Sequence, residues 1–273
     1  RREVLDMASF VVHHTAAMHF LKKLEESGIK ISQKNKNDFL LGNLIVDSID
    51  KEINVDEEIQ KKTTHFREND NEDKIVKYPN LDLFLDKYIS DLKNGDFKAI
   101  GYFFHLYTDY KFFNDLFKTS FTFLDRDYKE TVYTQNAVYV NLHKDGKIIN
   151  YKDLWTLNTE TSIYDDYTTI NKIVLEYFKY GFDYENLKNA AFDFENISIE
   201  EINPKNITSV LDSTNNYIKE SYATNNELKV FNIDDILNFI PEVVDSFSSD
   251  FSKIISNYNQ PLKLTKKKTN TKN

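Results

Sequence analysis

The stretch of residues 97–117, FKAIGYFFHLYTDYKFFNDLF, combines a long apolar and aromatic pattern with two isolated polar residues, His105 and Asp109. The apolar residues recur at helical spacing and Asp96 before them is a preferred N-cap residue, so we expect one helix over 97–117. Positions 105 and 109 project from the same face of that helix, about one turn apart. Because the helix is otherwise apolar, both side chains should be buried, where an unpaired carboxylate costs several kcal/mol. Asp109 therefore needs a partner, either a hydrogen bond to His105 inside a core or a metal ion.

The rest of the chain favours an all-α fold. It contains only 6 Gly and 4 Pro in 273 residues, and long segments repeat apolar residues at the helical period, so we predict a multi-helix bundle with short loops. Pro241 should kink or start the last helix. The segment 130–150 differs, because β-prone residues precede the turn 144–147, and there we predict a small β-hairpin. The other predicted helices cover residues 10–24, 39–49, 83–92, 168–179, 185–194, 207–222 and 233–258, and the expected N-caps of the first three are Ser9, Asp38, and Asn80 or Asp82.

We expect one helical domain over residues 7–262. No internal repeat or shift in composition marks a boundary, and the best hinge candidate is 203–206. Met7 and the two residues after it look like a natural start, so residues 1–6 are interpreted as a remnant that precedes it. The polar and basic residues 263–273 are predicted to form a disordered tail.

Composition limits the chemistry. The chain has no cysteine, so any transition metal must be bound by His, Asp or Glu. Its 44 acidic and 35 basic residues give a net charge of −9, which opposes general nucleic-acid binding, although a bound metal ion could invert the field inside a cleft. The absence of a long apolar run and of a signal-peptide pattern predicts a cytoplasmic protein without stable membrane insertion.

Three further candidate ligands precede the helix of residues 97–117. His13 lies on the apolar face of the first predicted helix, with its neighbour His14 as the alternative; Asp47 follows an apolar run, and His65 lies in a polar segment. Taken singly, these are a core histidine, a helix-end carboxylate that turns to solvent and an exposed histidine. Together with the later pair they form the series His, Asp, His, His-x-x-x-Asp, which suits a hydrolytic Zn²⁺ or mixed-metal site.

The series, its order and its flanking residues resemble the bacterial zinc-dependent phospholipase C family, whose broader relatives include single-strand-specific nucleases. The resemblance covers about residues 7–118 and is densest at 7–13, 41–48, 64–66 and 101–109. It implies a largely helical enzyme with a cleft that holds one to three Zn²⁺ ions, which Mn²⁺ or Fe could replace. The metal ligands that it implies are His13, Asp47, His65, His105 and Asp109.

The second half of the chain departs from the secreted members of that family, which also bind metal through an N-terminal Trp and through later His and Glu residues. Here the only Trp is Trp155, and the only later histidine is His143, in the predicted turn. Residues 163–167, IYDDY, look similar to a segment of some bacterial members, and carboxylates can complete a metal site. We therefore expect Asp166, or else Asp165, to complete the site while its neighbour caps the following helix.

The predicted function is metal-dependent hydrolysis of a phosphoester bond in a small substrate, by an enzyme of the phosphodiesterase or phospholipase C-like type. Asp47 or Asp109 would act as the base on the attacking water. Two alternatives belong to other classes. One is a catalytically degenerate helical protein that keeps a structural metal, and the other is a metal-free protein in which a His-Asp network stabilises the core.

Overall fold

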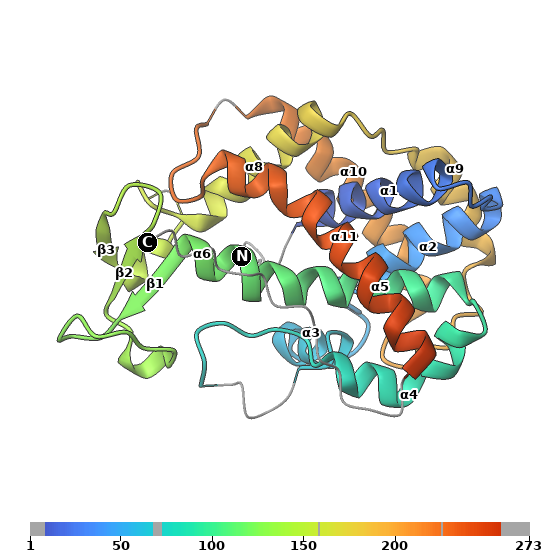
Figure 1. Cartoon of the computed structure of the whole chain (residues 1–273), viewed down its shortest axis with the longest axis horizontal. Coiled ribbons are helices and arrows are strands. Elements are labelled where there is room, and N and C mark those ends of the chain that lie inside the picture. Colours follow the sequence, from blue (N-terminus) through green and yellow to red (C-terminus); the bar gives the residue numbers. More distant parts are fainter. Residues whose placement is uncertain (1–8, 68–72, 158, 225, 258–273) are drawn as a thin grey trace.

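The computed structural model describes residues 9–67, 73–157, 159–224 and 226–257. The predicted remnant 1–6 and the predicted tail 263–273 lie outside these residues. Helices dominate the described part, which confirms the all-α prediction in outline, and a small antiparallel sheet accompanies them (Figure 1).

Most helices pack together in the larger part of the molecule, and the sheet lies at one end of it (Figure 1). A π-helical segment, η2 (Phe112–Phe117), continues the central helix α5 toward the sheet. The other helices and strands, in chain order, are α1 (Phe10–Glu26), α2 (Gln33–Ile45), α3 (Glu57–Thr64), α4 (Leu81–Lys93), α5 (Phe97–Lys111), α6 (Lys118–Ser120), β1 (Phe121–Leu124), η3 (Thr134–Asn136), β2 (Tyr139–Leu142), β3 (Ile148–Asn150), α7 (Tyr151–Leu154), α8 (Ile163–Phe178), α9 (Tyr184–Ala190), η4 (Ala191–Asp193), η5 (Pro204–Asn206), α10 (Ile207–Ala223) and α11 (Ile233–Asn257).

Side-chain caps explain where several helices begin. The side chains of Ser9, Asn80 and Asp96 accept backbone N–H groups in the first turns of α1, α4 and α5, which confirms those three predicted N-caps. Helix α2 begins earlier than predicted, after Ser32 instead of Asp38. Residues 33–38 are all polar. The prediction relied on apolar residues, which begin only at Phe39, and it therefore missed the polar first turns of the helix.

The predicted start of one further helix is wrong. Helix α8 begins at Ile163, five residues before the predicted start, so that both aspartates of the IYDDY segment lie within its first turn. Of the two alternatives for Pro241, a kink or a helix start, its position inside α11 excludes the second. Helix α3 was not predicted, because Ile59 is the only apolar residue among its eight, and the helix depends on the Asp56 cap and on its packing.

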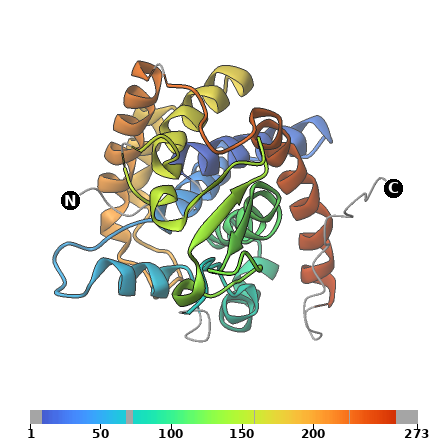
Figure 2. The same ribbon diagram turned by 90° about the vertical axis from the view of Figure 1, so that its left-hand side faces the viewer.

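The sheet has the order β1-β2-β3, with antiparallel pairing throughout. The predicted hairpin is confirmed by β2 and β3, whose connecting turn contains Gly146 in the left-handed region at φ 73°. Strand β1 was not predicted, because its sequence FTFL follows a long aromatic run that reads as helix. Figure 2 shows the sheet in front of the end of the central helix.

Two glycines allow α2 and α5 to cross in close contact. A Cβ atom at Gly42 would lie 2.1 Å from the carbonyl oxygen of Lys98, and a Cβ atom at Gly101 would lie 2.1 Å from that of Phe39. Any larger residue at either position would therefore push the two helices apart. This crossing holds the backbone of α2 against the face of α5 that carries the histidine and the aspartate of the quoted stretch.

Aromatic side chains form the core on the other side of α5. The ring of Phe247 on α11 meets Phe104 edge-on at 4.8 Å and Phe20 of α1 edge-on at 5.3 Å between centroids, a favourable arrangement for aromatic pairs. Tyr107 donates a hydrogen bond of 2.8 Å to the buried carboxylate of Asp250, which also ties α11 to α5. The middle of α5 is thus held rigidly between α2 and α11.

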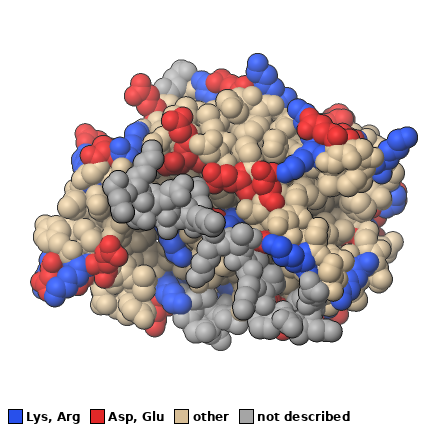
Figure 3. Space-filling model, in the orientation of Figure 1, with Lys and Arg blue, Asp and Glu red and all other residues tan. Residues whose placement is uncertain are grey.

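The surface carries both signs of charge. On the face shown in Figure 3 the described acidic and basic side chains are interspersed. None of the helices in the described ranges is both long enough and apolar enough to cross a membrane.

Candidate metal centre

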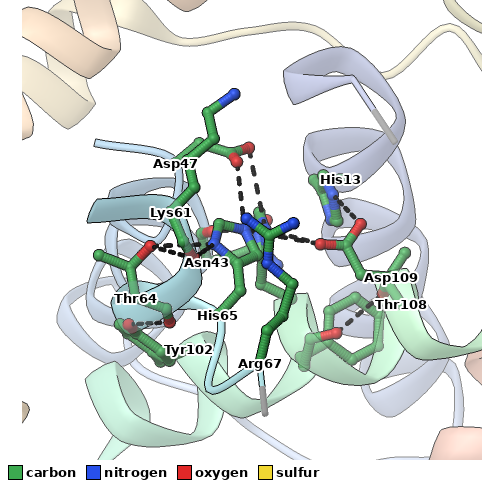
Figure 4. A network of polar contacts seen from close by, with 12 residues as sticks. His13, Asn43, Asp47, Lys61, Thr64, His65, Arg67, Tyr102, Thr108 and Asp109 are labelled. Atoms are coloured by element: carbon green, nitrogen blue, oxygen red, sulfur yellow. Dashed lines mark hydrogen bonds and ion pairs between the residues drawn. The ribbon is translucent and has the colours of Figure 1, made fainter. Parts of the chain in front are cut away.

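The structure brings together five of the side chains that the sequence singled out, from four separate elements (Figure 4). One comes from the first turn of α1, one lies two residues after α2, one is the C-cap residue of α3, and two lie on α5. In this order they are His13, Asp47, His65, His105 and Asp109, and we call them the metal cluster.

Short distances join these side chains. The Nε2 atom of His13 lies 3.1 Å from Oδ1 of Asp109, and the Nε2 atom of His65 lies 3.3 Å from Asp47 Oδ1 and 3.6 Å from Asp109 Oδ2. The Nε2 atom of His105 lies 3.5 Å from Asp109 Oδ2 and 3.8 Å from Asp47 Oδ2. The side chain of Asp47 is 10% exposed and the other four side chains are fully buried.

Backbone carbonyls determine which ring nitrogens can bind a cation. The Nδ1 atom of His105 lies 2.8 Å from the carbonyl oxygen of Asn43, and the Nδ1 atom of His65 lies 2.9 Å from that of Lys61. A carbonyl oxygen only accepts, so we assign the hydrogen to Nδ1 in both rings, and both Nε2 atoms then present a lone pair. The Thr64 hydroxyl oxygen also lies 2.9 Å from Nδ1 of His65 and accepts from it in this assignment, while its own hydrogen points to the Lys61 carbonyl. Metal-binding histidines are commonly oriented in this way by a backbone carbonyl behind the ring.

The atoms left without partners fit a divalent cation. Within the described ranges, no hydrogen bond reaches Nε2 of His65, Nε2 of His105 or Oδ2 of Asp109. All three are acceptors in these tautomers, and acceptors that face one another repel unless a cation lies between them. Two ligand atoms about 2.1 Å from one tetrahedral Zn²⁺ are separated by about 3.4 Å. The observed separations of 3.3–3.8 Å suit ligands of one ion better than direct hydrogen bonds.

The electrostatics lead to the same conclusion. Burial opposes ionisation of the carboxyl groups, but the imidazoles facing them outweigh it and hold the pKa of Asp47 at about 2 and that of Asp109 well below its usual value. Burial lowers the pKa of His13 and of His65, so these rings stay neutral. Only for His105 do the facing carboxylates outweigh burial and raise the pKa. Two buried negative charges thus lie among imidazoles of which at least two are neutral, and a divalent cation would balance these charges.

The end of α3 positions His65. The backbone N–H of Phe66 donates to the carbonyl of Thr63, and that of Arg67 donates to the carbonyl of Lys62, which is the Schellman arrangement. This motif requires a left-handed residue, and Phe66 supplies it at φ 52° although it is not a glycine. Such a conformation costs about 1–2 kcal/mol and is found preferentially at functional sites.

The remaining histidines lie elsewhere. His14, the sequence alternative to His13, is buried and its Nε2 donates to the carbonyl of Gly181 at 3.1 Å. His19 pairs with Tyr180 through its Nδ1. His143 lies in the hairpin turn, where it contacts Thr122 and Thr119. Of the two alternatives on α1, the structure therefore favours His13 as the ligand.

The structure does not bring Asp166 or Asp165 to the metal cluster. The carboxylate of Asp166 accepts the backbone N–H groups of residues 229, 230 and 231 at 2.6, 2.8 and 3.0 Å. Asp165 forms an ion pair of 2.8 Å with Lys229. Neither belongs to a group of potential metal ligands found in the described residues. Both aspartates instead attach the segment before α11 to the start of α8.

Sequence reasoning missed the groups that support the ligands. The carbonyls of Asn43 and Lys61 hold the rings of His105 and His65, and a carbonyl belongs to every residue, so no residue type reveals it. The only sequence signal for the first of these contacts is Gly42, whose size permits the helix crossing.

The chain matches no protein-family model, no curated protein and no solved structure. Its function therefore has to be inferred from the geometry and chemistry of the metal cluster.

Proposed function

We propose that the protein is a metal-dependent hydrolase of phosphoester bonds with a small substrate. The observation that carries the proposal is the convergence of two imidazole lone pairs and one carboxylate oxygen, all buried, that have no hydrogen-bond partner within the described residues. Three histidines with two carboxylates suit Zn²⁺, and Mn²⁺ or Fe would accept the same donors.

The two carboxylates are suited to different tasks. A bound Zn²⁺ would acidify water and stabilise negative charge on phosphate oxygens. Asp109 is fully buried and faces all three histidines, which suits a ligand. Asp47 is the one partly exposed member of the cluster, so it is the better placed to contact the attacking water, orient it and accept its proton.

A second candidate function is supported by the burial of the cluster. Four of its five side chains have no exposed surface, and structural metal sites are closed, whereas catalytic sites keep an open position. In this case the ion would join α1, α3 and α5 and would contribute to folding only.

Elemental analysis of the protein purified without added metal separates these functions when it is followed by assays on p-nitrophenyl phosphate monoesters and diesters. We expect bound zinc and turnover that the Asp47→Asn variant loses by about 10²-fold or more, with Asp165→Asn as the matched control because this carboxylate lies outside the cluster. One tightly bound ion without turnover on either ester would favour the structural metal. A folded protein that binds no metal would contradict both functions and favour a metal-free network of histidines and aspartates that stabilises the core.

A further inference from the structure

Arg67 is a buried cation with unused hydrogen-bonding capacity. Only 8% of its surface is exposed, and its Nη1 atom lies 3.3 Å from Glu58. Its Nε and Nη2 atoms are buried and have no hydrogen-bond partner among the residues that the structure describes. Buried donors without partners cost about 1–3 kcal/mol each, and more on a charged group, so their presence calls for an explanation.

The two unpartnered nitrogens lie on the same edge of the guanidinium. Arginine donates from this edge as a planar fork whose two parallel N–H bonds match two oxygens of a phosphate or carboxylate. Glu58 contacts the guanidinium through Nη1, so the Nε–Nη2 fork has no partner within the described residues.

Pairing with Glu58 does not explain why the guanidinium is buried. Lys77 also approaches Glu58, at 3.5 Å, and the side chains of both are substantially exposed, 35% for Lys77 and 46% for Glu58. An ion pair with a carboxylate as exposed as that of Glu58 contributes only about 0–1 kcal/mol to stability. Burying two guanidinium nitrogens without hydrogen-bond partners costs more free energy than this. Lys77 is thus sufficient as a partner for Glu58, and the fork of Arg67 remains available.

The backbone connects Arg67 closely to one member of the metal cluster. It follows His65 by two residues, and the Schellman turn through the left-handed Phe66 determines the relative positions of these residues. Figure 4 draws the Arg67 side chain rising from the end of α3 into the same close-up as the members of the metal cluster. The Nε–Nη2 edge of Arg67 and the metal-facing ring of His65 are therefore carried by the same turn.

We propose that the free edge of Arg67 binds an oxyanion next to the metal cluster, and that this oxyanion is the phosphoryl group of the substrate. The identification of the oxyanion rests on the proposed function, whereas the binding of an oxyanion by Arg67 does not. Arg67 is then the residue that selects substrates with two free acceptor oxygens on one centre and orients them toward the cluster.

Calorimetric titration of the zinc-loaded full-length protein with inorganic phosphate tests this inference. We expect Arg67→Gln to weaken phosphate binding at least tenfold with zinc content unchanged, because two charge-assisted hydrogen bonds are lost. Arg67→Lys should give an intermediate loss, since an ammonium keeps the charge without the fork. The matched control is Lys77→Gln, which removes the other cation that contacts Glu58 and should leave the affinity within about twofold.

The inference is overturned if the wild-type protein does not bind phosphate, or if Arg67→Gln binds it as tightly as the wild type. Should Arg67→Gln fail to fold, Arg67→Lys decides, and wild-type affinity in that variant overturns the inference. Ester hydrolysis by the same samples keeps the two proposals separate. Phosphate binding through Arg67 without any hydrolysis would refute the proposed function and support the anion site, whereas hydrolysis with unchanged KM and phosphate affinity in Arg67→Gln would refute only the role of Arg67.

Discussion

Asp109 and Asp166 are both buried carboxylates that lie on helices, yet their surroundings differ completely. Asp166 is surrounded by donors, because three consecutive backbone N–H groups point at its two oxygens. Asp109 is surrounded by imidazole nitrogens of which two present lone pairs, and its Oδ2 atom has no hydrogen-bond partner in the described part of the chain. The first carboxylate is satisfied by the fold, while the second needs something that the fold does not supply.

The neighbours His13 and His14 repeat this contrast. His14 donates to a backbone carbonyl of the loop before α9, while His13 faces Asp109 and stacks on the His105 ring at 3.6 Å between centroids. Burial alone therefore does not identify a metal ligand. The distinguishing property is whether the surrounding backbone satisfies the buried group.

The largest expected effect follows from removing a ligand on α5. His105→Ala should abolish zinc binding and lower the free energy of unfolding by about 3–5 kcal/mol, because it leaves two buried carboxylates without compensation. Elemental analysis and denaturant unfolding measure the two effects. His143→Ala is the control, since that histidine lies in the hairpin turn away from the cluster. Unchanged zinc content in His105→Ala would contradict the assignment of His105 as a ligand. The carboxylate of Asp109 would then be satisfied by the fold, like that of Asp166.

A smaller effect should distinguish His14 from its neighbour. Burial lowers the pKa of His14 from the usual 6.5 to about 4, so between these values the unfolded chain binds a proton that the folded protein does not. The stability that the neutral ring contributes is complete above pH 6.5 and is lost as the pH falls toward 4, by about 3 kcal/mol. Denaturant unfolding at about pH 7 and at about pH 4 measures this loss. The free energy of unfolding should fall less in His14→Gln than in the wild type between these two pH values, and the zinc content at neutral pH should be unchanged. Parallel stability curves for the two proteins would show that His14 does not titrate as inferred.

The smallest effects concern the start of α8. Asp166→Asn should lower the free energy of unfolding by about 2 kcal/mol, because the amide offers one acceptor oxygen to three N–H donors. Asp165→Asn should lower it by less than about 1 kcal/mol, since it removes one partly exposed ion pair. Both variants should keep full metal content and activity. A loss of zinc in either would restore the sequence prediction that this segment completes the metal centre.

Several parts of the fold could be predicted from local sequence. Ser9, Asn80 and Asp96 are effective N-caps because a short polar side chain reaches the first free N–H groups of its own helix. The turn with Gly146 closes the hairpin for a similarly local reason. Helix α3 and strand β1 could not be predicted, since one has almost no apolar pattern and the other lies in an aromatic run compatible with helix. Their structures depend on contacts with distant residues.

The candidate site divides in the same way. Residue types and spacing alone determined that His105 and Asp109 share a helix face, and that no cysteine competes with histidine and carboxylate as a ligand. Only the tertiary structure decided that His13 and not His14 joins them, and that Asp166 is bound by backbone N–H groups. It also showed that the fork of Arg67 has no partner in the described part of the chain. The physical reason is that hydrogen-bond satisfaction depends on backbone groups far away in the chain. Every residue carries such groups, so the sequence does not reveal which of them a buried side chain will meet.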